Sequence, residues 1–136
     1  MMAAPTGLVI SHDPTDLDFA TTSALLKASY WGGDRTDEVH LKAFSNSVCS
    51  IATIEGRQVG FGRASGDRTL FARISDVIVW PEHRGKGIGK AIVQSLLEHP
   101  DLATVSAWSL NTADAHGLYK QFGFAPVDGN TMELRR

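Results

Sequence analysis

The sequence predicts an α+β fold in a single domain, with helices covering a mixed sheet. Its 136 residues, 43% of them apolar, suffice for one compact core and leave little room for a second. Strand-like segments joined by turns fill the middle of the chain, and helix-like segments lie on both sides of them. We therefore expect one domain over residues 1–136, with about six or seven strands in a twisted, mostly antiparallel sheet and about four helices.

The first third of the chain predicts one strand and then helices. An apolar stretch over residues 8–11 is typical of a short strand. Asp13 and Pro14 then mark a helix start, because Asp caps a helix and Pro suits its first position, and this helix should end near Tyr30. Residues 36–45 have few apolar positions, so they could form a second helix or a loop.

The middle of the chain predicts an antiparallel meander of three strands. These strands cover residues 48–54, 58–64 and 69–80, with turns at Gly56 and Gly66. Beyond Trp80 the pattern changes to alternating helices and strands. We expect a helix over 87–98, a strand over 104–110, a helix over 114–122 and a hairpin over 125–134 that turns at Asp128-Gly129-Asn130.

Composition narrows the choice of partners and location. A net charge of −2 gives no reason to expect nucleic acid or an anionic membrane as the main partner. The single Cys49 cannot form an intrachain disulfide, and the N-terminal residues lack the pattern of a signal peptide, so we expect a cytoplasmic protein. The five histidines show no metal-ligand spacing with one another or with Cys49, so we expect no metal site.

The glycine run in "WPEHRGKGIGKAIVQSLL", residues 80–97, predicts an anion-binding turn before a helix. A phosphate-binding loop would need glycine where Arg84 stands, and a dinucleotide-binding turn would need glycine where Lys90 stands. The run nevertheless has two features that such phosphate-binding turns share. Glycines let the backbone approach a ligand, and a helix N-terminus presents free amides to an anion. A tight turn with solvated basic residues is the alternative.

Two segments together resemble a known family. "VIVWPEHRGKGIG", Val77–Gly89, is similar to the acyl-CoA signature of the GNAT superfamily of N-acyltransferases, whose Arg/Gln-x-x-Gly-x-Gly/Ala core matches Arg84, Gly87 and Gly89. "LNTADAHGLYKQFGF", Leu110–Phe124, is similar to the segment of that family that ends in Leu-Tyr-x-x-x-Gly-Phe. The resemblance covers nearly the whole chain and implies a GNAT-like fold.

The resemblance implies an enzyme that transfers an acetyl group from acetyl-CoA to a primary amine of a small molecule, by direct attack in a ternary complex. It also implies that the strands before and after the glycine-run helix run parallel and splay apart. Residues expected to contact coenzyme A are Ile78, Val79, Arg84, Gly85, Lys86, Gly87, Ile88, Gly89, Lys90, Thr112 and His116. Those expected at the acceptor entrance are Trp31, Arg35, Ser47 and Arg63.

Two residues are candidates for the chemistry. By resemblance Tyr119 is the general acid, and a phenol with a pKa near 10 can protonate a leaving thiolate. Helical periodicity alone would place the same tyrosine in the core. Asp76, among apolar neighbours, is the leading candidate for the general base; alternatively it is exposed at a strand end or bonded to an arginine such as Arg63 or Arg73. His116 or a water relay could also take the proton.

Other functions stay open from the sequence. An arginine-rich acceptor wall would favour a substrate with a carboxylate, although Arg35 and Arg63 could pair with Asp34, Asp37 or Asp67 instead. The same chemistry could act on a protein lysine or N-terminus, or the chain could be a catalytically silent acyl-CoA sensor. Relatives of this size are often dimers, so a homodimer is possible.

Overall fold

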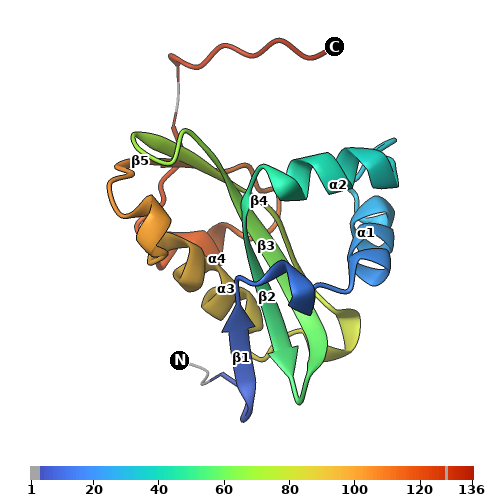
Figure 1. The fold of residues 1–136 in the computed structure, drawn as a ribbon. Helices are drawn as coiled ribbons and strands as arrows, with labels where there is room; N and C mark the ends of the chain where they lie inside the picture. The colour runs from blue at the N-terminus through green and yellow to red at the C-terminus, as the bar shows by residue number, and fades with distance from the viewer. Residues whose placement is uncertain (1–3, 128) are drawn as a thin grey trace.

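A five-stranded sheet forms the centre of the computed structural model, which describes residues 4–127 and 129–136 (Figure 1). Its strands lie in chain order and comprise β1 (Leu8–Ser11), β2 (Val48–Ile54), β3 (Arg57–Gly66), β4 (Phe71–Val79) and β5 (Ala107–Ser109). Neighbouring strands from β1 to β4 pair antiparallel. β5 runs parallel to β4 and pairs with it only over residues 71–73. The α+β class and the mostly antiparallel sheet are thus confirmed.

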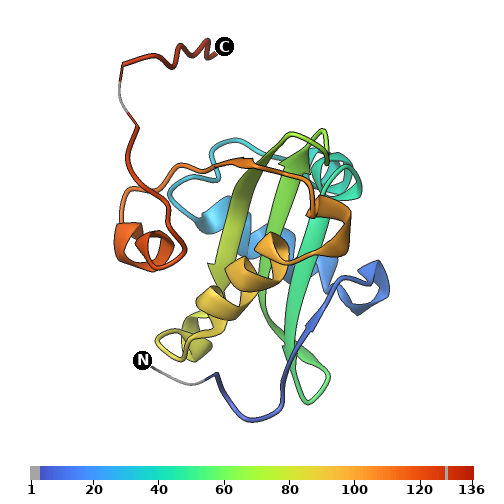
Figure 2. The same ribbon diagram turned by 90° about the vertical axis from the view of Figure 1, so that its left-hand side faces the viewer.

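Helices cover both faces of this sheet (Figures 1 and 2). The helices are α1 (Phe19–Ala28), α2 (Asp37–Ser45), α3 (Ile88–Leu97) and α4 (His116–Lys120). α1 and α2 lie on one face, and α3 lies on the other. Side-chain caps fix two of the starts, because Asp18 accepts a hydrogen bond from the amide of Thr21 and Thr36 accepts one from the amide of Val39. Residues 36–45, left open between helix and loop, therefore contain a helix.

The two faces have separate cores. Ile74, Ile88 and Ile92 belong to the core on the α3 side, whereas Phe61 and Ile78 belong to the core under α1 and α2. α3 packs very close to the sheet because β3 presents glycine to it: a β-carbon at Gly62 would lie 2.6 Å from Cγ2 of Ile92. The position of α3, and therefore of the glycine run before it, is fixed by this contact.

A β-bulge interrupts β4 at Asp76. Phe61 pairs with Ile78 and Arg63 pairs with Ser75, so Gly62 alone faces two residues of β4. Asp76 adopts a left-handed conformation with φ 56°, a region in which Asp is among the better-tolerated side chains. The bulge lies just beyond the short β4–β5 pairing, where the two strands separate.

Several predicted boundaries were wrong. The sheet has five strands among the described residues rather than six or seven, because residues 125–127 and 129–134 contain no strand; Met132 and Leu134 are exposed and pair with no sheet edge. Asp128, at the expected turn, lies outside the described residues. The first helix is divided, because Leu17 is extended and Asp18 starts α1 anew. No helix among the described residues is long and apolar enough to cross a bilayer.

Candidate active site

The glycine run connects β4 to α3 in a conformation that only glycine adopts readily. Gly85 and Gly87 both have left-handed backbones, with φ 78° and 81°, and a β-carbon there would cost about 1–2 kcal/mol per residue. Gly87 is the N-cap of α3. Because glycine has no side chain to accept a hydrogen bond, no capping side chain binds the first backbone amides of the helix. The run therefore presents backbone donors at the positive end of a ten-residue helix.

A cavity of about 450 Å³ lies over these amides. Its lining comprises Val79, His83, Arg84, Gly85, Gly87, Ile88, Gly89, Lys90, Leu118 and Gln121. We call it the cradle pocket. Free amides, two cationic side chains and glycine surfaces suit a phosphate-bearing ligand, so the donor set fits the pyrophosphate of coenzyme A. The guanidinium of Arg84 donates to the carbonyl of Val79 at 3.1 Å, which holds this side chain at the edge of the pocket.

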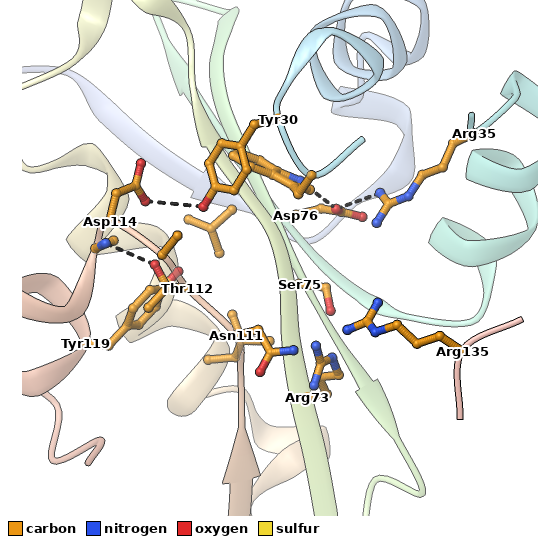
Figure 3. Close-up of a pocket in the computed structure, with 15 residues that line it drawn as sticks. Tyr30, Arg35, Arg73, Ser75, Asp76, Asn111, Thr112, Asp114, Tyr119 and Arg135 are labelled. Carbon is orange, nitrogen blue, oxygen red and sulfur yellow. Dashed lines mark hydrogen bonds and ion pairs between the residues drawn. The ribbon is translucent and has the colours of Figure 1, made fainter. Parts of the chain in front are cut away.

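A second cavity, of about 560 Å³, opens where β4 and β5 separate (Figure 3). Its lining comprises Tyr30, Trp31, Arg35, Arg73, Ile74, Ser75, Asp76, Val77, Asn111, Thr112, Ala113, Asp114, Ala115, Tyr119 and Arg135. We call it the acceptor pocket. Val77 lines this pocket and Val79 lines the cradle pocket, while α4 contributes Tyr119 to one and Leu118 to the other. The end of β4 and α4 therefore border both cavities.

Asp76 lies in the wall of the acceptor pocket as a buried, paired anion. Its side chain is only 1% exposed and contacts Arg35 Nη1 at 2.7 Å and Arg63 Nε at 2.8 Å. The indole N–H of Trp31 donates to the same carboxylate at 3.2 Å. Burial raises the pKa of Asp76, but the hydrogen bonds from Arg35 and Arg63 outweigh it, so the net pKa lies below the ordinary 3.8. These contacts favour the arginine-bonded alternative over a general base.

Tyr119 lines the acceptor pocket and a further cavity beside β5, next to Leu118 of the cradle pocket, and is 9% exposed. Burial raises its pKa, and the nearby Tyr30 and Asp114 raise it further, so the phenol holds its proton at neutral pH. Its ring packs edge-to-face on Phe124 at 5.9 Å. Tyr119 thus packs in the core, as the periodicity indicates, and also lines the acceptor pocket with a protonated phenol, the form that an acid needs.

The structure gathers most, but not all, of the predicted site residues. Lys86 is exposed and does not line the cradle pocket, and the side chain of Ile78 packs into the core under α1 and α2. His116 lines a third cavity beside β5, which Thr112 also borders. Thr112 further accepts a hydrogen bond from the amide of Ala115 at 3.0 Å.

Two predicted acceptor residues lie behind the pocket wall rather than in it. Arg63 bonds Asp76 and also donates to the hydroxyl of Ser47 at 3.1 Å, and neither residue lines the acceptor pocket. Trp31 and Arg35 do line it. Cys49 is mostly buried, and burial raises the pKa of its thiol to about 11, which fits a core residue rather than a nucleophile.

Six pocket-lining polar residues were not among the predicted site residues: Tyr30, Arg73, Ser75, Asn111, Asp114 and Arg135. A weak signal exists for Arg73 and Ser75, because they alternate with buried Ala72 and Ile74 along β4. Asn111 and Asp114 lie inside the segment that carries the second family motif. Nothing in the local sequence around Arg135 indicates that it reaches this pocket.

Comparisons with known proteins match this architecture. The sequence model of the GNAT acetyltransferase domain matches residues 45–126, more than half of the chain. The uncharacterized N-acetyltransferase ycf52 of Pyropia yezoensis is 33% identical over 88 residues, which cover 60% of this chain and 51% of that protein. The chloroplastic GCN5-related N-acetyltransferase 3 of Arabidopsis thaliana is 33% identical over 105 residues, which cover 75% and 44%. The chain thus spans about half the length of these relatives.

Solved structures extend the match to the whole fold. A protein assigned to the GNAT family of acetyltransferases from Xanthomonas campestris pv. campestris is 37% identical, with a TM-score of 0.86 over 92% of this chain and 88% of that one. Glucosamine-6-phosphate N-acetyltransferase from Arabidopsis thaliana, at 19% identity and a TM-score of 0.67, shares the fold over 93% of this chain and 97% of its own. The chain therefore belongs to the GNAT family of acetyltransferases.

Proposed function

We propose that this chain transfers the acetyl group of acetyl-CoA to the primary amine of a small molecule. The observation that carries the proposal is the pair of cavities that share β4 and α4 as a border. One cavity has the donor set for a pyrophosphate, and the other has the size and the polar lining for a small acceptor. Substrates in these cavities would meet at the end of β4, next to Tyr119.

The cradle pocket would hold coenzyme A through backbone rather than side-chain groups. The amides around Gly85 and Gly87 would bind the pyrophosphate, supported by the charges of Arg84 and Lys90. When bound, acetyl-CoA supplies an acetyl thioester, and amide formation requires one proton to leave the amine and one to reach the departing thiol. Residues of this chain must therefore manage two protons.

Tyr119 is our candidate for the proton donor. Its raised pKa keeps the phenol protonated until a strong base such as a thiolate forms beside it. Asp76 is poorly suited to accept the amine proton, because both of its carboxylate oxygens are bonded to arginines and its pKa is lowered. We assign Asp76 a positioning role in the pocket wall and let water in the open acceptor pocket take the amine proton.

The acceptor pocket gives less support to a protein substrate. Arg35, Arg73 and Arg135 line it, so a lysine-rich peptide would meet like charges. A silent sensor would need the cradle pocket but would have no use for a protonated tyrosine in the wall of the acceptor pocket.

A coupled assay tests the proposal. Thiol release from acetyl-CoA is followed with a panel of amines, amino acids, aminoglycosides and lysine peptides, and mass spectrometry identifies any N-acetyl product. We expect release that depends on an added small amine. Tight acetyl-CoA binding without release by any acceptor would favour the sensor, and release with lysine peptides alone would favour a protein substrate.

A further inference from the structure

The acceptor pocket has opposite charges at its two ends (Figure 3). Asp114 lies at one end, beside Tyr119, and the hydroxyl of Tyr30 donates to its carboxylate at 3.4 Å. Arg35, Arg73 and Arg135 lie at the other end. This separation restricts the acceptor, because a ligand that spans the pocket meets an anion near the reaction centre and cations away from it.

The cationic end is not neutralised by its nearest carboxylate. The carboxylate of Asp76 forms ion pairs with both Arg35 and Arg63, so one negative charge is shared by two positive charges. Arg73 forms no ion pair with any carboxylate in residues 4–127 or 129–136. Arg135 pairs with Glu133 at 3.3 Å. Among the described residues, the four arginines at positions 35, 63, 73 and 135 therefore outnumber the two carboxylates, Asp76 and Glu133, that pair with them.

Arg73 is held at the point where the two parallel strands separate. It is the last residue of β4 that pairs with β5, opposite Ser109. With its amide oriented to satisfy both of its groups, Asn111 accepts from Arg73 Nη2 at 2.9 Å and donates to the carbonyl of Leu110 at 3.2 Å. A guanidinium has five N–H donors, so this single contact orients Arg73 and leaves donors for a ligand.

We propose that the acceptor amine also carries an oxyanion, a carboxylate or a phosphate, which binds at Arg73. Arg35 and Arg135 line the same end, each paired with a carboxylate (Asp76 and Glu133), and the hydroxyl of Ser75 adds a neutral donor. The amino group of the same molecule lies toward Asp114 and Tyr119, the end that borders the cradle pocket. This assignment of a substrate class rests on the proposed acetyl transfer in the same pocket.

The charge layout also discriminates against other amines. A polycation such as an aminoglycoside would place at least one positive charge against the arginine end. A monoamine with no acidic group could bind near Asp114 but would leave Arg73 without an ionic partner. An acceptor with one amine and one oxyanion satisfies both ends of the pocket.

Equilibrium binding without acetyl-CoA tests the subsite directly. Matched probes are amino acids of increasing amine-to-carboxylate separation, each against its carboxamide, and 2-aminoethyl phosphate against ethanolamine. We expect the oxyanion member of at least one pair to bind about tenfold to 100-fold more tightly, as for a charge-assisted guanidinium bond. The carboxylate and phosphate arms show which oxyanion the site prefers.

Substitution of Arg73 assigns the preference to this residue. Arg73→Gln should remove most of the selectivity, and Arg73→Lys should keep part of it, because lysine retains the charge without the planar fork. Arg57→Gln is the matched control: Arg57 is also an exposed strand arginine, but it lies at the β2–β3 turn and outside the acceptor pocket. Circular dichroism checks that each variant folds.

The outcomes separate this inference from the proposed function. Equal binding of acids and amides, or selectivity that survives Arg73→Gln, would overturn the oxyanion subsite. Acetylation of neutral amines with no oxyanion preference would overturn it while leaving acetyl transfer intact. Selective oxyanion binding with no transfer to any amine would support the subsite and contradict the proposed function alone.

Discussion

The cradle pocket and the acceptor pocket share a border but are built in different ways. Most of the cradle pocket comes from one continuous segment, residues 79–90, and its proposed contacts are backbone amides. The acceptor pocket combines side chains from four separate parts of the chain: residues 30–35, 73–77, 111–119 and Arg135. A site made of backbone tolerates changes of side chain as long as the chain keeps its path, whereas a site made of side chains can change specificity with one substitution. The proposed cofactor site is therefore constrained by conformation, and the proposed acceptor site by chemistry.

The largest effect should come from Gly87→Glu. The change forces a side chain onto a left-handed residue and places a carboxylate among the amides that would bind pyrophosphate. Loss of several charge-assisted bonds should weaken acetyl-CoA binding roughly 1,000-fold in calorimetry. Gly56→Glu is the control, because Gly56 has φ 77°, open space around it and a place at a hairpin turn outside the cradle pocket. Equal loss in both variants would point to misfolding instead.

Asp76→Asn should have the next largest effect, on stability rather than on cofactor binding. The variant keeps a residue that tolerates the left-handed backbone but leaves two arginines without their anion. Breaking such a buried pair should lower the free energy of unfolding by about 3 kcal/mol at pH 7 in urea titrations. Asp37→Asn, which removes an exposed pair with Lys27, should cost much less.

The ion pairs of Asp76 with Arg35 and Arg63 also make the stability of the protein depend on pH. The pKa of Asp76 is lower in the folded protein than its ordinary value of 3.8. The stability that the ionised Asp76 adds is therefore fully present above pH 3.8 and is lost as the pH falls through the folded-state pKa. Wild type and Asp76→Asn should thus converge in stability as the pH is lowered below about 4. A constant difference down to the acid limit would contradict the pairing.

Tyr119→Phe should act on the rate. If the phenol protonates the leaving thiol, its loss should lower kcat about 100-fold, while the affinity for acetyl-CoA and the melting temperature change little. Stopped-flow thiol release and calorimetry on the same preparation measure the two quantities. An unchanged kcat would leave Tyr119 as a core residue packed on Phe124.

Gly117→Ala should have the smallest effect. A β-carbon at this position of α4 meets nothing within 4 Å, so the substitution should raise the free energy of unfolding by up to about 1 kcal/mol. If the arm of coenzyme A passes along this face, affinity should nevertheless fall, by less than about tenfold. Thermal melts and calorimetry distinguish the two effects, and unchanged affinity would place the arm elsewhere.

The sequence predicted the glycine turn and the start of the following helix because the information for both is local. Glycines at fixed spacing before an amphipathic helix specify a turn and its free amides without reference to the rest of the fold. The antiparallel meander was predicted for a similar reason, since alternation and turn residues occur within each strand pair. α2 was harder to assign because few of its residues are apolar, and its cap at Thr36 is its clearest signal.

The acceptor pocket could not be predicted in the same way. Arg73 and Asn111 come together only because β5 returns parallel to β4 and then separates from it. The alternative pairing of Asp76 with Arg63 is confirmed, whereas Arg35, whose partner was sought at Asp34, Asp37 or Asp67, also bonds Asp76 on the bulge. The prediction of a C-terminal hairpin was wrong. Polar and apolar residues alternate over residues 131–134, but such a pattern forms a strand only where a sheet edge is available to pair with it.

The bulge at Asp76 also determines which face of the sheet each half of β4 presents. Ile78 follows Ile74 by four positions, so in a regular strand their side chains would point to the same face. Here Ile74 packs under α3 and Ile78 packs under α1 and α2, because the extra residue between them reverses the alternation. Straightening the bulge without removing a residue would turn one half of the strand over and place its apolar side chains against the wrong layer. The apolar pattern of β4 therefore requires an irregularity between these two isoleucines, and the bulge at Asp76 supplies it.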